Sequence, residues 1–165
     1  MSRQIKNIIA ITFFLICIGL INFAGQNIDI EIRGINAFTF ILIVAVLLQI
    51  IFFIPSFLLK TEKYYDLVGS LTYVTTVSLA YFAVENKTMI DSIIYFYVMV
   101  WALRLGIYLF RRVRNDGKDV RFEKAKRHFF WFLQYWMGQA LWVALTACAA
   151  IIAILSPEDN TLPVL

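Results

Sequence analysis

Residues 36–59 read NAFTFILIVAVLLQIIFFIPSFLL and contain no Asp, Glu, Lys, Arg or His. A helix needs roughly 17–25 apolar residues to cross about 30 Å of hydrocarbon, so this stretch is long enough to span a bilayer. It lacks the alternation of polar and apolar residues that a barrel strand would show. Because lipid offers the backbone no hydrogen-bond partners, such a stretch is expected to be helical. The stretch therefore predicts a transmembrane helix.

Four further apolar runs lie on either side of this stretch, at residues 8–24, 67–84, 89–110 and 129–155. The chain is 61% hydrophobic, well above the roughly 45–50% of a soluble domain. No Pro/Gly/Ser-rich linker separates the runs. We therefore predict an all-α fold, in which residues 1–165 form one polytopic membrane bundle of about five transmembrane helices, surrounded by membrane lipids.

The basic residues are unevenly distributed among the connections between these runs. Twelve of the 15 Lys and Arg residues precede the first run or lie in the second and fourth connections: Arg3, Lys6, Lys60, Lys63, Arg111, Arg112, Arg114, Lys118, Arg121, Lys124, Lys126 and Arg127. Since basic residues concentrate on the cytoplasmic side, the N-terminus is predicted to be cytoplasmic. This pattern also explains the net charge of +4, and we expect no nucleic-acid partner.

The longest connection, residues 111–128, is the one substantial soluble segment. Asn115-Asp116-Gly117 is a turn signal, and a short helix capped by Asp119 is predicted to follow it. A basic turn beside a helix N-terminus is suited to anion binding. Basic connections are equally expected on the cytoplasmic side of any membrane protein, so both interpretations remain open.

Three polar residues at or near the apolar runs are candidates for specific roles. Arg104 lies within the fourth run, where a guanidinium costs at least about 2.5–3.5 kcal/mol; it either faces a functional cavity or snorkels to the interface. Gln139, in the fifth run, either bonds across helices or lines a cavity. Asp66 is predicted to cap the third helix. No cluster of Cys or His suggests a metal site, and the catalytic residues are unknown.

Several motifs together resemble the steroid 5-alpha reductase-like membrane family, and more closely its bacterial branch, which is known only as a domain of unknown function. They are WALRLGIYLF at residues 101–110, followed by Arg112, KDVRF at 118–122, DLVGSLT at 66–72 and QALWV at 139–143. The resemblance extends from about Tyr64 onward. It implies a location in a bacterial inner membrane.

Characterised members of this superfamily use NADPH to reduce a carbon–carbon double bond of a sterol or similar lipid. The resemblance therefore implies NADPH as cofactor and a lipid or steroid-like substrate. By motif position it implies that Arg104, Asp119 and Arg121 bind the cofactor. The residues assigned in the same way to the substrate cavity are Trp101, Tyr108 and Gln139.

The family's Arg-His-Pro-Asn-Tyr-like motif, prominent in cofactor binding, does not occur in this sequence. We therefore expect a truncated version of a longer fold, with a helix partner supplying the further spans. Two alternatives to a reductase remain. One is a non-catalytic membrane scaffold or subunit, and the other is a lipid-directed methyltransferase, because isoprenyl-cysteine methyltransferases resemble the same superfamily.

Overall fold

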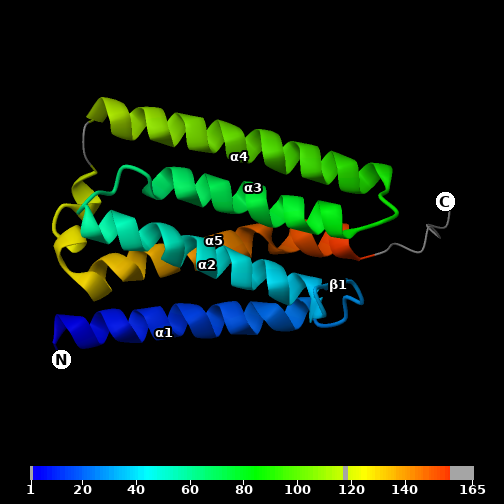
Figure 1. Cartoon of the computed structure of the whole chain (residues 1–165), viewed down its shortest axis with the longest axis horizontal. Helices are drawn as coiled ribbons and strands as arrows, with labels where there is room; N and C mark the ends of the chain where they lie inside the picture. The colour runs from blue at the N-terminus through cyan, green and yellow to red at the C-terminus, as the bar shows by residue number, and fades with distance from the viewer. Residues whose placement is uncertain (1, 117–118, 157–165) are drawn as a thin grey trace, which may run out of the picture.

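The computed structural model describes residues 2–116 and 119–156, and five long helices run side by side through this part of the chain (Figure 1). These helices are α1 (Arg3–Asn22), α2 (Ala37–Leu58), α3 (Tyr65–Ala83), α4 (Met89–Asp116) and α5 (Phe129–Leu155). The all-α bundle predicted from the sequence is confirmed.

Four of these helices, α1, α2, α4 and α5, are long and apolar enough to cross a membrane within the described residues. The protein is therefore an integral membrane protein. The remaining helix, α3, has 19 residues and lies between its neighbours along much of their length (Figure 1). It is not among the four helices apolar enough to span, and it carries Ser, Thr and Tyr side chains on several turns.

Three hydroxyl groups of α3 donate hydrogen bonds to backbone carbonyls within the bundle. Thr72 Oγ1 donates to the Val68 carbonyl at 2.7 Å, and Thr76 Oγ1 donates to the Thr72 carbonyl at 2.8 Å. Ser70 Oγ donates across to the Ala102 carbonyl of α4 at 2.5 Å. Because these three hydroxyls bond to backbone carbonyls, their donors stay paired in the apolar bundle.

The core lies where α2, α3 and α5 meet, while α1 packs on the outside against α5 and α4 on the outside against α3. Phe38, Val77 and Ala140 are completely buried in this core. The outer faces of α1 and α4 consist largely of exposed apolar side chains, which is the arrangement expected for helices that face lipid.

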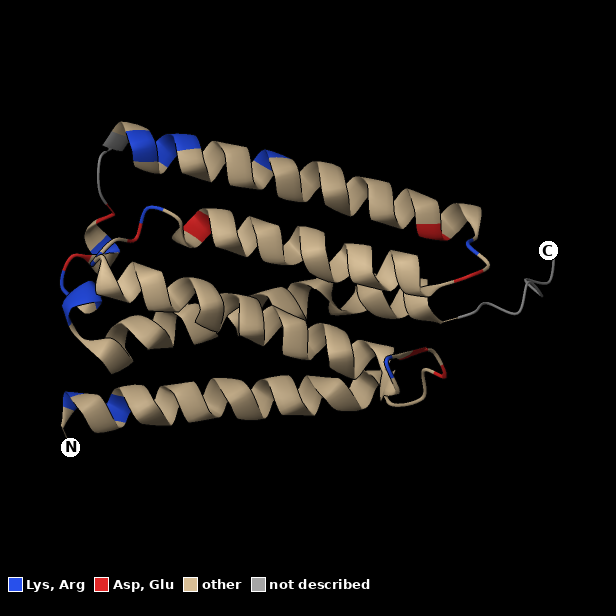
Figure 2. Cartoon of the chain, viewed as in Figure 1, with Lys and Arg blue, Asp and Glu red and all other residues tan. Residues whose placement is uncertain are grey.

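Most basic residues gather at one end of the bundle, which we call the basic end (Figure 2). It contains the start of α1, the α2–α3 connection and the segment 119–128 between α4 and α5. The sequence placed these three segments on one side of the membrane, and the structure agrees. That this side is cytoplasmic stays a prediction from the distribution of charge.

The opposite end carries a small hairpin that the sequence analysis did not predict. Strands β1 (Glu31–Ile32) and β2 (Ile35–Asn36) pair in antiparallel register around Arg33 and Gly34, both of which have positive φ. Two such residues are characteristic of a type I′ turn. Asn36 then begins α2, because its Oδ1 accepts a hydrogen bond from the Thr39 amide at 3.1 Å.

Two local predictions need correction. Helix α4 continues to Asp116, so Asn115 and Asp116 belong to a helix and not to the predicted turn, whereas Gly117 lies outside the described residues. Asp66 does not cap α3 but lies in its first turn, and the cap position is occupied by Tyr64.

The predicted cap at Asp119 is confirmed on a shorter helix. Its side chain accepts a hydrogen bond from the Arg121 amide at 3.0 Å and begins the 3-10 turn η2 (Val120–Phe122). A second such turn, η3 (Ala125–Arg127), leads into α5, and a third, η1 (Phe23–Gly25), follows α1. Three residues form too short a helix to provide the anion site considered above.

Candidate functional site

The outer face of α4 carries a shallow groove of about 790 Å³ that is open to the surroundings. Its lining residues all belong to α4: Val100, Leu103, Arg104, Ile107, Tyr108, Arg111, Arg112 and Asn115. Arg104, Tyr108, Arg111 and Asn115 follow one another at intervals of four, three and four residues, which places them on one side of the helix. We call this the α4 groove.

Arg104 is the deepest charge in the α4 groove. It lies seven residues before Arg111, or about 10 Å along the helix axis from the basic end. Its side chain is exposed and points away from the bundle, and among the described residues it has no ion-pair or hydrogen-bond partner. The guanidinium is therefore available to an external anion, or to the interface if it snorkels.

Arg112 connects the α4 groove to α3. Its Nη2 donates to Asp66 Oδ2 at 3.3 Å, so one arginine of the groove is already held by a carboxylate. The other oxygen of Asp66 lies 4.0 Å from Arg121 Nη2. Asp66 is 12% exposed, and burial raises the pKa of its carboxyl, although both guanidiniums oppose this shift.

Asp119 and Arg121 form a close ion pair at the basic end. Arg121 Nη2 lies 2.5 Å from Asp119 Oδ2, and Arg121 Nε donates to both carboxylate oxygens at 3.0 Å. This hydrogen bonding lowers the pKa of Asp119. The guanidinium carbon also lies 5.2 Å from the centre of the Phe122 ring. The guanidinium of Arg121 therefore already contacts both Asp119 and Phe122 of the protein.

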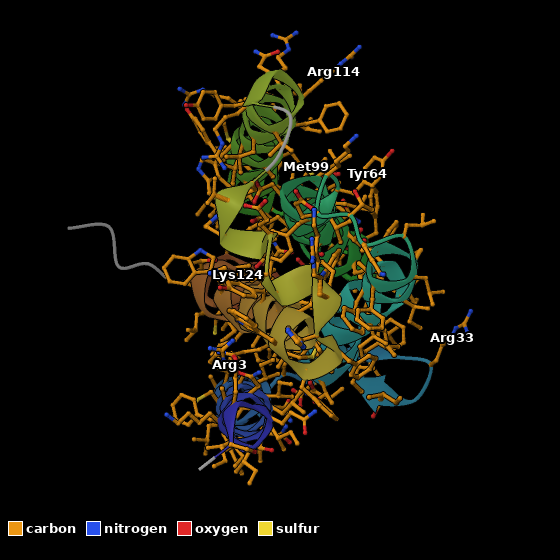
Figure 3. All side chains as sticks on the ribbon, turned by 90° about the vertical axis from the view of Figure 1, so that its left-hand side faces the viewer. Arg3, Arg33, Tyr64, Met99, Arg114 and Lys124 are labelled. Atoms are coloured by element: carbon orange, nitrogen blue, oxygen red, sulfur yellow. The ribbon has the colours of Figure 1, made fainter. Side chains whose placement is uncertain are left out.

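Glu62, in the α2–α3 connection, forms hydrogen bonds to the segment 119–128. Only 4% of Glu62 is exposed, and its carboxylate accepts hydrogen bonds from the Asp119 amide at 3.2 Å and from Lys126 Nζ at 2.6 Å. Phe122 is buried and packs on Tyr65, with ring centres 4.7 Å apart. Figure 3 views this end directly, with Lys124 and Tyr64 labelled. The sequence analysis missed Glu62. The available sign was that an acidic residue lies between two lysines, Lys60 and Lys63.

The structure brings only some of the predicted site residues together. Arg104 and Tyr108 share the α4 groove. Asp119 and Arg121 pair with each other at the basic end and connect to that groove through Asp66 and Arg112.

The other two residues assigned to a cavity lie elsewhere. The Trp101 ring packs edge-on against Tyr73 of α3, with ring centres 4.9 Å apart. The Gln139 amide lies over Gly69 in the interior. Trp101, Tyr108 and Gln139 therefore contact three different surroundings. The part of the chain that the structure describes contains no group of His, Cys, Asp and Glu suited to hold a metal.

Comparison with known proteins identifies one relationship. No curated protein and no solved structure matches the chain. A family model described as "Protein of unknown function (DUF1295)" matches residues 52–165, a region that includes α3, α4 with its groove, and α5. The match covers more than half of the sequence, and the chain therefore belongs to the DUF1295 family.

Proposed function

We propose that this membrane protein belongs to an NADPH-dependent reductase of lipid carbon–carbon double bonds, in which the α4 groove binds the phosphates of the cofactor. The observation that carries the proposal is the unpaired guanidinium of Arg104, aligned with Arg111 in a groove that enters the apolar part of α4. The resemblance of residues 101–110 to the reductase motif supports the same position.

The chemistry of the groove suits a phosphate-bearing ligand. Guanidinium groups bind phosphate through paired hydrogen bonds, and Tyr108 and Asn115 add neutral donors on the same side of the helix. NADPH supplies a hydride when it is bound. In this proposal Arg104 and Arg111 hold and orient the phosphates, and Arg112, held by Asp66, limits where they can lie.

The apolar part of the groove suits a lipid substrate. Val100 and Leu103 continue the lining towards the middle of the span, where a substrate dissolved in the bilayer can reach it laterally. The groove has only one helical wall, so a second surface has to cover a bound cofactor. We propose a helix partner as that surface, and a bacterial inner membrane as the location.

Binding of NADPH to the detergent-purified full chain tests the proposal. We expect saturable binding in a fluorescence titration at low salt, and a loss of about tenfold or more in affinity for Arg104→Ala, since a hydrogen bond between charged groups contributes about 1.5–3 kcal/mol. Arg114→Ala is the matched control. It removes an equal charge from α4, but its side chain lines a separate hollow with Lys63 and Tyr64.

Three results would argue against the proposal: no binding to the wild-type chain, unchanged binding to Arg104→Ala, or equal losses in both variants. S-adenosylmethionine, titrated in parallel, tests the methyltransferase alternative. Saturable binding of that compound, with none of NADPH, would favour a methyltransferase.

A membrane scaffold or subunit is the second candidate function. Ile93, Tyr97 and Val100 are exposed at helical spacing on α4, and a helix of another protein could pack against them. This candidate predicts a stable complex in mild detergent extracts of the native membrane that Tyr97→Lys dissociates and Tyr64→Lys leaves intact, since Tyr64 is exposed on another side. Light scattering of the tagged, purified chain measures the change in mass.

A further inference from the structure

Two hollows at the basic end share one lining residue, Tyr64. The first, of about 250 Å³, lies between the start of α3 and the end of α4 and is lined by Lys63, Tyr64, Phe110, Val113 and Arg114. The second, of about 310 Å³, lies between α2 and α3. We call them the basic hollow and the apolar hollow. Figure 3, which views this end, labels Tyr64 and Arg114.

The basic hollow has two cations and no acid among its described lining residues. Lys63 comes from the α2–α3 connection and Arg114 from the last turn of α4, and both are exposed. Neither charged group has an ion-pair or hydrogen-bond partner within the part of the chain that the structure describes, whereas the nearby Arg112 is paired with Asp66. Two like charges in one hollow repel each other, and an anion between them reverses the sign of this interaction. The basic hollow therefore suits an anionic group.

The apolar hollow extends from the basic end towards the middle of the bundle. Tyr64, Leu67 and Leu71 line it at intervals of three and four residues, on one side of α3. Leu71 lies seven residues beyond Tyr64, or about 10 Å along the helix axis. Phe52 and Pro55 of α2 form the opposite wall. A hollow with these walls suits a hydrocarbon chain that lies along the helices.

The end of α2 holds the two hollows side by side. Lys60 has positive φ, its amide donates to the Phe57 carbonyl at 3.2 Å, and the Thr61 amide donates to the Ser56 carbonyl at 2.9 Å. These two bonds are those of a Schellman motif, which turns the chain back at the end of a helix. Thr61 Oγ1 then accepts from the Lys63 amide at 3.4 Å. Since Thr61 lines the apolar hollow and Lys63 the basic one, this turn fixes a cation beside the apolar walls.

The order of the two hollows matches the order of groups in a phospholipid. The basic hollow lies at the end of the apolar helices, at the level of the head groups, and basic pockets between helices on the cytoplasmic side bind anionic head groups. Free phosphate would occupy only this hollow, and a zwitterionic lipid would bring a cation towards Lys63 and Arg114. We propose that one anionic phospholipid binds here, with its phosphate between Lys63 and Arg114 and an acyl chain in the apolar hollow.

This lipid site is separate from the α4 groove. No described residue lines both the groove and either hollow. The inference therefore does not rest on the proposed function, and Arg104→Ala should leave lipid binding unchanged.

Native mass spectrometry of the full chain in a mild detergent tests the inference. Palmitoyl-oleoyl phosphatidylglycerol is the anionic lipid, and phosphatidylcholine with the same acyl chains is the comparison. We expect the first phosphatidylglycerol to bind at least about fivefold more tightly, since one basic residue near an anionic lipid changes affinity by about that factor. Excess inorganic phosphate should not displace it. Equal affinities for the two lipids, or displacement by phosphate, would overturn the inference.

Two variants test the cations. Lys63→Ala and Arg114→Ala should each weaken phosphatidylglycerol binding about fivefold and leave phosphatidylcholine binding unchanged. Lys6→Ala is the matched control, because it removes an exposed charge from the same end on α1, which lines neither hollow. It should keep the wild-type affinity. Equal losses in all three variants would indicate general attraction of charge and would overturn the inference.

Leu71→Trp tests the position of the acyl chain. Leu71 is 41% exposed at the inner end of the apolar hollow, so a larger side chain there takes up the space without unfolding the bundle. Phosphatidylglycerol binding should weaken severalfold. Leu20→Trp makes the same change at a position on α1 that is 60% exposed, and it should have no effect. Unchanged binding in Leu71→Trp, with a thermal midpoint equal to that of the wild type, would overturn the inference.

Discussion

Asp66 and Asp119 both approach the guanidinium of Arg121, yet the pKa values of the two carboxyls move in opposite directions. Arg121 Nη2 lies 2.5 Å from Asp119 and 4.0 Å from Asp66. Hydrogen bonding lowers the pKa of Asp119, whereas burial, the larger effect at Asp66, raises its pKa. Asp66 precedes the apolar residues 67–84, so both groups lie at the basic end of the bundle. Their contributions to stability therefore depend on pH with opposite signs.

Asp119→Asn should lower the thermal midpoint at pH 7. A carboxyl whose pKa is lower in the folded than in the unfolded chain stabilises the fold above its unfolded value of about 3.9, and this stabilisation disappears as the pH falls through the folded pKa. The difference from wild type should therefore shrink below about pH 4. Thermal unfolding in detergent between pH 3 and 8 measures it. Asp29→Asn, an exposed change of equal charge at the other end of the bundle, is measured beside it as the control.

Asp66→Asn should show the reverse trend. Because the pKa of Asp66 is higher in the folded chain, the wild type loses stability as the pH rises from the unfolded value of about 3.9 through the folded pKa. Asparagine does not titrate, so the stability of the variant relative to wild type should rise over this interval. Losing the hydrogen bond to Arg112 lowers the stability of the variant by an amount that does not depend on pH, so it does not change this trend. The same thermal series supplies the data. If the difference in thermal midpoint from wild type changed with pH in the same direction for Asp66→Asn and Asp119→Asn, the result would contradict the structure.

Gly106→Ala should loosen α4 from α3. A Cβ on Gly106 would overlap the side chain of Ser70, which is buried and hydrogen-bonded to Ala102. Overpacking of this kind typically costs about 1–3 kcal/mol. Thermal unfolding of the variant measures the loss. Gly19→Ala is the control, because nothing lies within 4 Å of its added Cβ and alanine favours a helix, so its midpoint should stay equal or rise.

Lys126→Met should destabilise the basic end strongly. It leaves the carboxylate of Glu62, which is 4% exposed, without its ion pair, and removing one member of a buried pair costs about 3–5 kcal/mol. Adding Glu62→Gln should restore part of this stability, since the amide can still accept from the Asp119 N–H. Limited proteolysis of the segment 119–128 reports the effect locally. A double variant cleaved as fast as Lys126→Met would argue against the pair.

Hydropathy alone located all five helices, and the predicted run 129–155 coincides with α5. The predicted end of α4 at residue 110 was wrong, because the sequence analysis ended the run just before Arg111. A group of arginines marks the edge of the lipid, whereas the hydrogen bonds of the helix continue to Asp116. The hairpin at Arg33 and Gly34 was missed because its strands have only two residues each, too few for any periodicity. The one available signal was Gly34, because glycine adopts positive φ without steric cost.

The candidate site was less accessible to sequence reasoning. Arg104 stood out because a charge interrupts an apolar run, and the motif placed Tyr108 beside it, as the structure does. The sequence could not show that Trp101 faces Tyr73 or that Gln139 faces Gly69, since that depends on the rotation of each helix about its axis. The binding roles of Arg104, Asp119 and Arg121 stay predictions.

The hydroxyl-rich character of α3 has a consequence for biosynthesis. A nascent segment with these side chains partitions into the bilayer less readily than its neighbours do. The bond from Ser70 to Ala102 requires α4, and the bond from Gln49 to Thr72 requires α2. We therefore expect α3 to be stable in the membrane only after α4 has been synthesised. The two helices should then insert together as a helical hairpin that packs against α2, which is already in the membrane.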